Sequence, residues 1–107
     1  MPKYLIQATY TAEGLRGVMK ETASGRRAAV TRMIEGAGGK VEGFYYSLGD
    51  YDAVLIVDAP DNITGAALSL AASASGLVRT NTTVLLTVEE MDQAIAKRVD
   101  YVPPGSG

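Results

Sequence analysis

The chain contains short stretches whose composition favours strands and longer stretches in which apolar residues recur every three or four positions. Alternation with a period of two is typical of a half-buried strand, and spacing of three and four is typical of a helix. The stretch from Lys3 to Tyr10 alternates in this way and is expected to be the first strand. One of its faces carries Tyr4, Ile6, Ala8 and Tyr10.

A helical region is predicted from about residue 12 to residue 37. Thr11 supplies a side-chain oxygen suited to a helix N-cap, and Gly38-Gly39 is a plausible stop. We expect a break near Gly25, within Ser24-Gly25-Arg26-Arg27. Apolar residues recur at helical spacing on both sides of it, at Leu15, Val18, Met19, Ala29, Val30, Met33, Ile34 and Ala37.

A β-hairpin is predicted around Gly49-Asp50-Tyr51-Asp52. Gly accepts a positive φ and Asp can hydrogen-bond its own backbone, so the dipeptide Gly49-Asp50 favours a turn. The flanking stretches, 41–46 and 52–58, are rich in the aromatic and β-branched residues that favour strands.

The second half of the sequence predicts a helix, a strand and a short terminal helix. Asp61 or Asn62 could cap the first of these helices, which is rich in small, uncharged residues and ends near Gly76. The β-branched stretch 77–86 is expected to be a fourth strand. Thr87-Val88-Glu89-Glu90 has the form of a capping box and opens the terminal helix, and residues 103–107 are expected to be a disordered tail.

The order strand, helix, strand, strand, helix, strand, helix is that of an α+β, ferredoxin-like split βαβ fold. In this fold a four-stranded antiparallel sheet carries two helices on one face. The other face is left uncovered, and its apolar residues favour a partner surface. We therefore expect two sheets to face each other in a homodimer or a larger homo-oligomer.

Composition narrows the class of protein. A length of 107 residues with 47% hydrophobic content is typical of one domain, and a net charge of -2 argues against nucleic-acid binding. The chain has neither Cys nor His, which excludes thiolate nucleophiles and His general bases within it. It shows no apolar run long enough for a membrane span and no signal peptide, so we expect a cytoplasmic protein without a membrane partner.

The chain resembles the GYD domain family of small bacterial proteins over roughly residues 3 to 96. The resemblance rests on Tyr4-Leu5-Ile6, Tyr10-Thr11, Gly38-Gly39-Lys40-Val41, Gly49-Asp50-Tyr51-Asp52 and Thr80-Asn81-Thr82-Thr83. It implies a fold similar to the dimeric α/β barrels, and a biochemical role that is unassigned. A single domain over residues 1–98, followed by a flexible tail over 99–107, is the corresponding domain organisation.

Five residues are candidate ligand contacts: Tyr10, Tyr45, Tyr51, Asp52 and Arg79. Tyr combines an apolar body with a polar tip and suits a pocket wall, but it suits a sheet interface equally well. Asp52 could accept a ligand hydrogen bond or act as a base, although a turn accounts for it without any ligand. Arg79 interrupts apolar residues and could pair with a carboxylate such as Asp52 or Asp58. No metal site is expected, because the spacing of the Asp residues here fits no metal-binding loop.

Two functions remain open. The first is a non-catalytic homo-oligomer that binds a small molecule or serves as an assembly module, with no cofactor. The alternative is a cofactor-free monooxygenase- or isomerase-like enzyme acting on a small organic compound in a cavity between sheet and helices. Its acid or base would have to be Asp52, Glu42 or a tyrosine. The absence of His favours the first.

Overall fold

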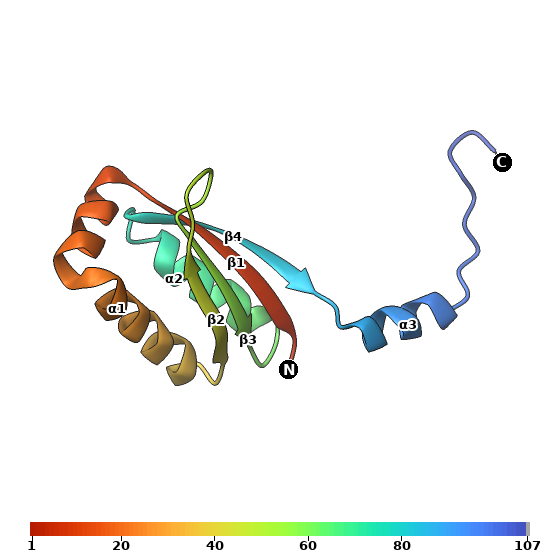
Figure 1. The fold of residues 1–107 in the computed structure, drawn as a ribbon. Coiled ribbons are helices and arrows are strands. Elements are labelled where there is room, and N and C mark those ends of the chain that lie inside the picture. Colours follow the sequence, from red (N-terminus) through yellow and green to blue (C-terminus); the bar gives the residue numbers. More distant parts are fainter. Residues whose placement is uncertain (107) are drawn as a thin grey trace.

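The structure, a computed structural model, describes residues 1–106 and forms an open, four-stranded antiparallel sheet with three helices (Figure 1). The strands lie in the order β2-β3-β1-β4, which confirms the predicted α+β ferredoxin-like fold. The elements are β1 (Lys3–Tyr10), α1 (Ala12–Gly36), β2 (Lys40–Tyr46), β3 (Ala53–Asp58), α2 (Asn62–Ser73), β4 (Val78–Leu85) and α3 (Val88–Ala96).

The alternation of β1 decides which side chains enter the core. Tyr4 and Ala8 are buried on the face that α1 and α2 cover, as the period-two pattern predicts. In the neighbouring strand β3, Val57 and Ala53 pair with these two residues and are buried on the same face. Ile34 of α1 and Leu68 of α2 complete the core from above the sheet.

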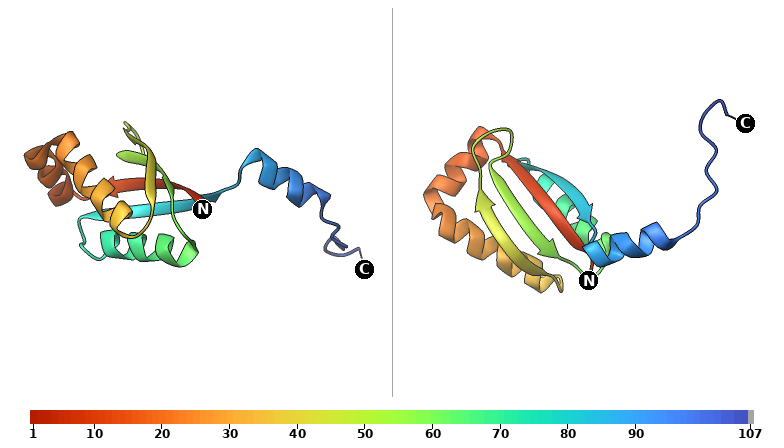
Figure 2. Two further views of the ribbon diagram at one scale, coloured as in Figure 1. Left: turned by 90° about the horizontal axis from the view of Figure 1, so that it is seen from below. Right: turned by 45° about the vertical axis from the view of Figure 1, so that its right-hand side comes forward.

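Both α1 and α2 lie on the same side of the sheet (Figure 2). The N-caps expected for them form, because Thr11 accepts from the backbone N–H of Gly14, and Asp61 from that of Thr64. The break in α1 falls at Thr22, three residues before Gly25, with φ 75° and ψ 161°. The Thr22 hydroxyl accepts a 3.2 Å hydrogen bond from the Gly25 N–H, so Thr22 acts as the cap of the second half of α1.

The opposite face of the sheet carries no helix, as the sequence predicts (Figure 2). Leu5, Val54 and Ile56 lie on it and are half-buried.

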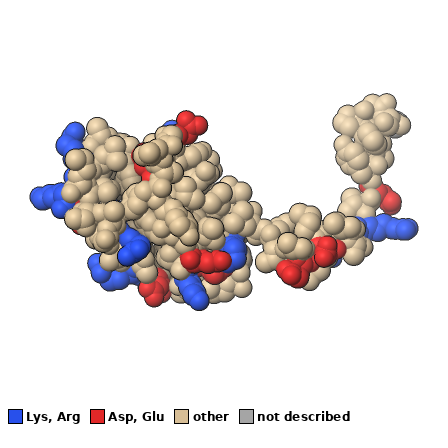
Figure 3. Space-filling model, viewed as in Figure 1, with Lys and Arg blue, Asp and Glu red and all other residues tan. Residues whose placement is uncertain are grey.

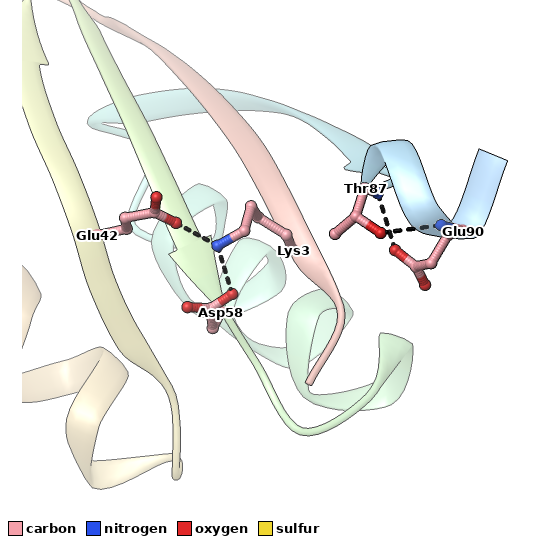
Figure 4. Close-up of polar contacts among 5 residues, drawn as sticks. All are labelled: Lys3, Glu42, Asp58, Thr87 and Glu90. Atoms are coloured by element: carbon pink, nitrogen blue, oxygen red, sulfur yellow. Dashed lines mark hydrogen bonds and ion pairs between the residues drawn. The ribbon is translucent and has the colours of Figure 1, made fainter. Parts of the chain in front are cut away.

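At one end of the sheet, the Lys3 ammonium donates to Glu42 and, at 2.8 Å, to Asp58 (Figure 4). These hydrogen bonds raise the pKa of Lys3, with that to Asp58 contributing most. Glu42 sits at a β-bulge, where the pairing of β2 with β3 shifts by one residue.

The terminal helix α3 begins with the predicted capping box. The Thr87 hydroxyl accepts from the Glu90 N–H, and the Glu90 carboxylate accepts from the Thr87 N–H (Figure 4). This helix projects beyond the end of the sheet, and the segment after it runs further away (Figure 1).

Gly107, the last residue of the expected tail, lies outside the described residues. No helix in the described part of the chain has the length and apolar character that crossing a membrane requires.

Candidate ligand cavity

An open cavity of about 220 Å³ lies between the helices and the covered face of the sheet. Its walls are mostly apolar. The sheet contributes Ile6, Ala8, Tyr10, Phe44, Leu55, Val78, Thr80 and Thr82, α1 contributes Arg26, Ala29, Val30, Met33 and Ile34, and α2 with the turn after it contributes Leu68, Ser69, Ala71, Ala72 and Ser75. The cavity exists because α1 packs mainly on β2 and α2 on β4, so the helices diverge above the middle of the sheet.

One wall of this cavity carries the guanidinium of Arg26. Its Nε lies 2.9 Å from Glu21 Oε1 in an ion pair, yet the N–H is not aligned for a hydrogen bond. The Nε atom is buried and has no hydrogen-bond partner. Glu21 balances the charge at Nε, and the remaining guanidinium N–H groups of this partly exposed side chain are the donors that a ligand acceptor could use.

Two tyrosines lie close enough to Arg26 for its positive charge to affect their pKa values. Burial raises the pKa of Tyr10, which lines the cavity, while Arg26 acts to lower it. Burial likewise raises the pKa of Tyr46, against the opposing effect of Arg26. The Tyr46 hydroxyl donates a 3.0 Å hydrogen bond to the carbonyl of Ala23, just after the break in α1. Both phenols therefore stay protonated at neutral pH and can serve as donors.

The break at Thr22 lies between the two members of the ion pair. A positive φ is rare for a β-branched residue and costs on the order of 1–3 kcal/mol, and such strain often accompanies a functional site. Glu21 precedes the break and Arg26 follows it, so the bend helps to bring their side chains together. The other wall is polar at Thr80, whose hydroxyl lies 2.7 Å from the Ser69 hydroxyl.

Backbone hydrogen bonds hold the Gly49–Asp52 loop to β1 and to the end of β2. The Asp52 N–H donates to the carbonyl of Ala8, and the Ser47 N–H donates to the carbonyl of Asp52. Gly49 has φ +146°, a value that L side chains rarely adopt. The Asp52 carboxylate accepts a 2.8 Å hydrogen bond from the Tyr10 N–H, at the end of β1. These contacts fit the structural interpretation of the motif, in which Asp52 accepts backbone N–H groups.

The five candidate residues are divided between two faces of the sheet. Tyr10 lines the cavity. Tyr45 and Arg79 belong to the uncovered face, and the Tyr51 hydroxyl accepts from the side-chain amide of Asn81 on that face. Asp52 binds the backbone of Tyr10 between the two groups. Asp58 pairs with Lys3 rather than with Arg79.

Arg26 is the cavity residue that the candidate set lacks. In the sequence, Arg26 falls in the predicted break before the apolar repeat at Ala29, and with Arg27 and Arg32 it could form either an anion-binding patch or a solvated helix face. Arg26, Val30 and Met33 follow the spacing i, i+4, i+7, which places Arg26 on the apolar face of the second half of α1. A charge at an apolar position of a helix is the signal that could have identified it.

Replacing Asp52 with Ala is expected to lower the free energy of unfolding by about 1–2 kcal/mol, because the Tyr10 N–H loses a charged acceptor. Asp50→Ala, which removes an exposed carboxylate from the same loop, is the matched control and should change stability by less than about 0.5 kcal/mol. Urea unfolding followed by circular dichroism measures both. Equal effects of the two variants would contradict the role given to Asp52.

Fold and cavity together define a small α+β protein with an open antiparallel sheet, two helices on one face and a mostly apolar cavity beneath them. Within residues 1–106 no acidic cluster is arranged to hold a metal ion. The profile of the GYD domain matches residues 4–95, and the chain belongs to this family. Searches among curated proteins and among solved structures found no significant match.

Proposed function

We propose that this GYD domain is a homo-oligomeric binding protein that holds a small, largely apolar molecule in the cavity under α1 and α2. The observation that carries the proposal is the presence of one guanidinium, that of Arg26, in the otherwise mostly apolar walls of the cavity. Ligand sites typically combine apolar walls with a few well-placed polar groups that fix orientation. A carboxylate or another acceptor on the ligand would satisfy Arg26.

The volume limits the size of the ligand. An apolar cavity of about 150 Å³ admits benzene. A cavity of about 220 Å³ is suited to a somewhat larger molecule, such as an aromatic ring bearing one short polar substituent. Tyr10, in the sheet wall, adds a phenol donor close enough to Arg26 for the guanidinium to act on its pKa.

Binding is favoured over catalysis by the state of the carboxylates. The cavity wall contains no Asp or Glu among the residues described, and Asp52 is engaged by the Tyr10 N–H. Glu42, another candidate base, pairs with Lys3 at the edge of the sheet. An enzyme working in this cavity would have to use Tyr10 as its base, and burial raises the pKa of that phenol away from neutrality.

The uncovered face of the sheet supports self-association. Leu5, Val54 and Ile56 form an apolar centre on this face, and Gln7 and Thr83 lie beside it. A second copy would cover the same residues with their equivalents, as a two-fold interface requires. The resulting pair of facing sheets is the dimeric α/β barrel arrangement that the resemblance to the GYD domain family implies.

The test is a titration with benzoate and with toluene, followed by amide NMR shifts. Benzoate is expected to shift the amides of the cavity walls, and Arg26→Gln to weaken its binding at least tenfold because the guanidinium is lost. Arg27→Gln removes a neighbouring exposed charge that does not line the cavity and should leave benzoate affinity unchanged. Ala29→Phe fills the cavity and should abolish binding of both compounds.

Benzoate affinity that survives Ala29→Phe would contradict the proposed cavity, as would equal effects of Arg26→Gln and Arg27→Gln. Native mass spectrometry of protein purified gently from its host then tests the wider proposal. An oligomer carrying a reproducible small-molecule mass is the expected result. A monomer would contradict the self-association.

A further inference from the structure

Helix α3 presents an apolar face that its own domain leaves exposed. Val88, Met91 and Ile95 follow the spacing i, i+3, i+7 and share this face, with exposed fractions of 75%, 47% and 74%. We refer to these three residues as the α3 face. All the ribbon views show α3 beyond the end of the sheet (Figures 1 and 2).

The extended position of α3 indicates that it needs a partner. A helix of 9 residues is too short to be stable alone in water. The radius of gyration is 17.2 Å, whereas a compact chain of this length has about 13 Å. Leu86, Val99 and Tyr101 on either side of α3 are also exposed, so the apolar surface continues along the segment.

The first half of α1 offers a surface of matching chemistry. Leu15 and Met19 lie one turn apart, with exposed fractions of 41% and 79%; we call them the α1 stripe. Arg16 and Lys20 adjoin this stripe, whereas Glu89, Glu90 and Asp92 surround the α3 face. On the visible face of the molecule, Lys and Arg gather over α1 and acidic side chains over α3 (Figure 3).

The α3 face cannot reach the α1 stripe of its own chain. Leu85 pairs with Lys3 at one end of β1, and α1 starts after Tyr10 at the other end. Eight strand residues span about 24 Å, whereas the three steps from Leu85 to Val88 cover at most about 11 Å. The stripe that matches the α3 face must therefore belong to another molecule.

We propose that the α3 face of one copy packs on the α1 stripe of a second copy, and that the exchange is reciprocal. Apolar side chains meet at the centre, and the acidic residues of α3 lie beside Arg16 and Lys20 of the other molecule. A two-fold axis generates both contacts at once and closes the assembly as a dimer. This contact goes beyond the proposed cavity and does not require the two sheets to face each other.

Because the chain has no Cys, engineered cysteines test the contact cleanly. Met19→Cys and Met91→Cys are made in separate chains, mixed, and oxidised mildly. A disulfide needs Cα atoms within about 7 Å, so a mixed disulfide between the two variants is the expected product. Ala28→Cys, exposed on the second half of α1, replaces Met19→Cys in the matched control. A mixed-disulfide yield no higher than that of the control overturns the proposal.

Sedimentation equilibrium gives a second, independent measurement. Ile95→Asp places a charge in the α3 face and is expected to weaken dimerisation at least tenfold. Gln93→Ala changes an uncharged residue on the opposite side of the same helix, outside the proposed contact, and should weaken dimerisation less than threefold. Both side chains are on an exposed helix, so the domain should fold in each variant. Unchanged dimerisation of Ile95→Asp, or a monomeric unmodified chain, overturns the proposal.

Discussion

Replacing Gly14 with Ala is expected to destabilise the domain by about 3 kcal/mol. A Cβ at this position would lie 2.1 Å from the carbonyl oxygen of Leu77, which is backbone and cannot move aside as a side chain would. The same carbonyl accepts a 2.9 Å hydrogen bond from the Thr11 N–H, so the start of α1 is held against the start of β4. Relieving the overlap moves the helix and breaks this bond, and overpacking of this kind costs about 1–3 kcal/mol or more.

Gly17→Ala is the matched control, in the same helix and three residues away. No atom lies within 4 Å of the Cβ it would introduce. Because Ala favours a helix over Gly by about 1 kcal/mol, this variant should be slightly more stable than the unmodified protein. Urea unfolding of the two variants measures the difference, and a stabilised Gly14→Ala protein would show that α1 does not dock on Leu77 in this way.

Ile34→Ala is expected to lower the free energy of unfolding by about 3 kcal/mol. The Ile34 side chain is 1% exposed and is one of the two largest that are fully buried among the residues described. Truncating it removes buried methyl groups and leaves a void beside an existing cavity, a change that typically costs about 2–5 kcal/mol. This is a large share of the roughly 5–15 kcal/mol that stabilise a whole domain.

Ile63→Ala provides the comparison for Ile34, because it removes the same atoms from a side chain that is 81% exposed. Its expected effect is within about 0.5 kcal/mol of zero. Thermal and urea unfolding, followed by far-ultraviolet circular dichroism, report both. Similar losses for Ile34→Ala and Ile63→Ala would mean that α1 does not close the core as described.

The candidate site was predictable only in part. Tyr10 was singled out as a pocket residue, and it does line the cavity. Tyr45 was also singled out, and it lies on the uncovered face because its neighbour in β2, Phe44, faces the cavity and adjacent strand residues point to opposite sides. Which side meets the helices depends on packing, and a strand pattern that is apolar on both faces does not reveal it.

The break in α1 shows the same limit. The sequence places it near Gly25, since Gly is a poor helix former, yet the chain bends at Thr22, a β-branched residue with positive φ. Local propensity disfavours that conformation. The Thr22 hydroxyl caps the next helical half, and the bend lets Arg26 reach Glu21. Tyr46 of β2 also donates to the carbonyl of Ala23 beside the break, and this contact joins residues that are remote in the sequence.

By itself, the sequence determined the elements, their order and the fold, because periodicity, caps and turn residues act over a few neighbouring positions. Thr11, Asp61 and Thr87 cap their helices as expected. Only the tertiary structure decided that Arg26 enters the cavity and that α3 stands away from the sheet. The cavity around Arg26 depends on how far apart α1, α2 and the sheet lie, and the position of α3 depends on whether the domain offers it a surface to pack on. Both are set by contacts between residues remote in the chain, which local sequence patterns do not contain.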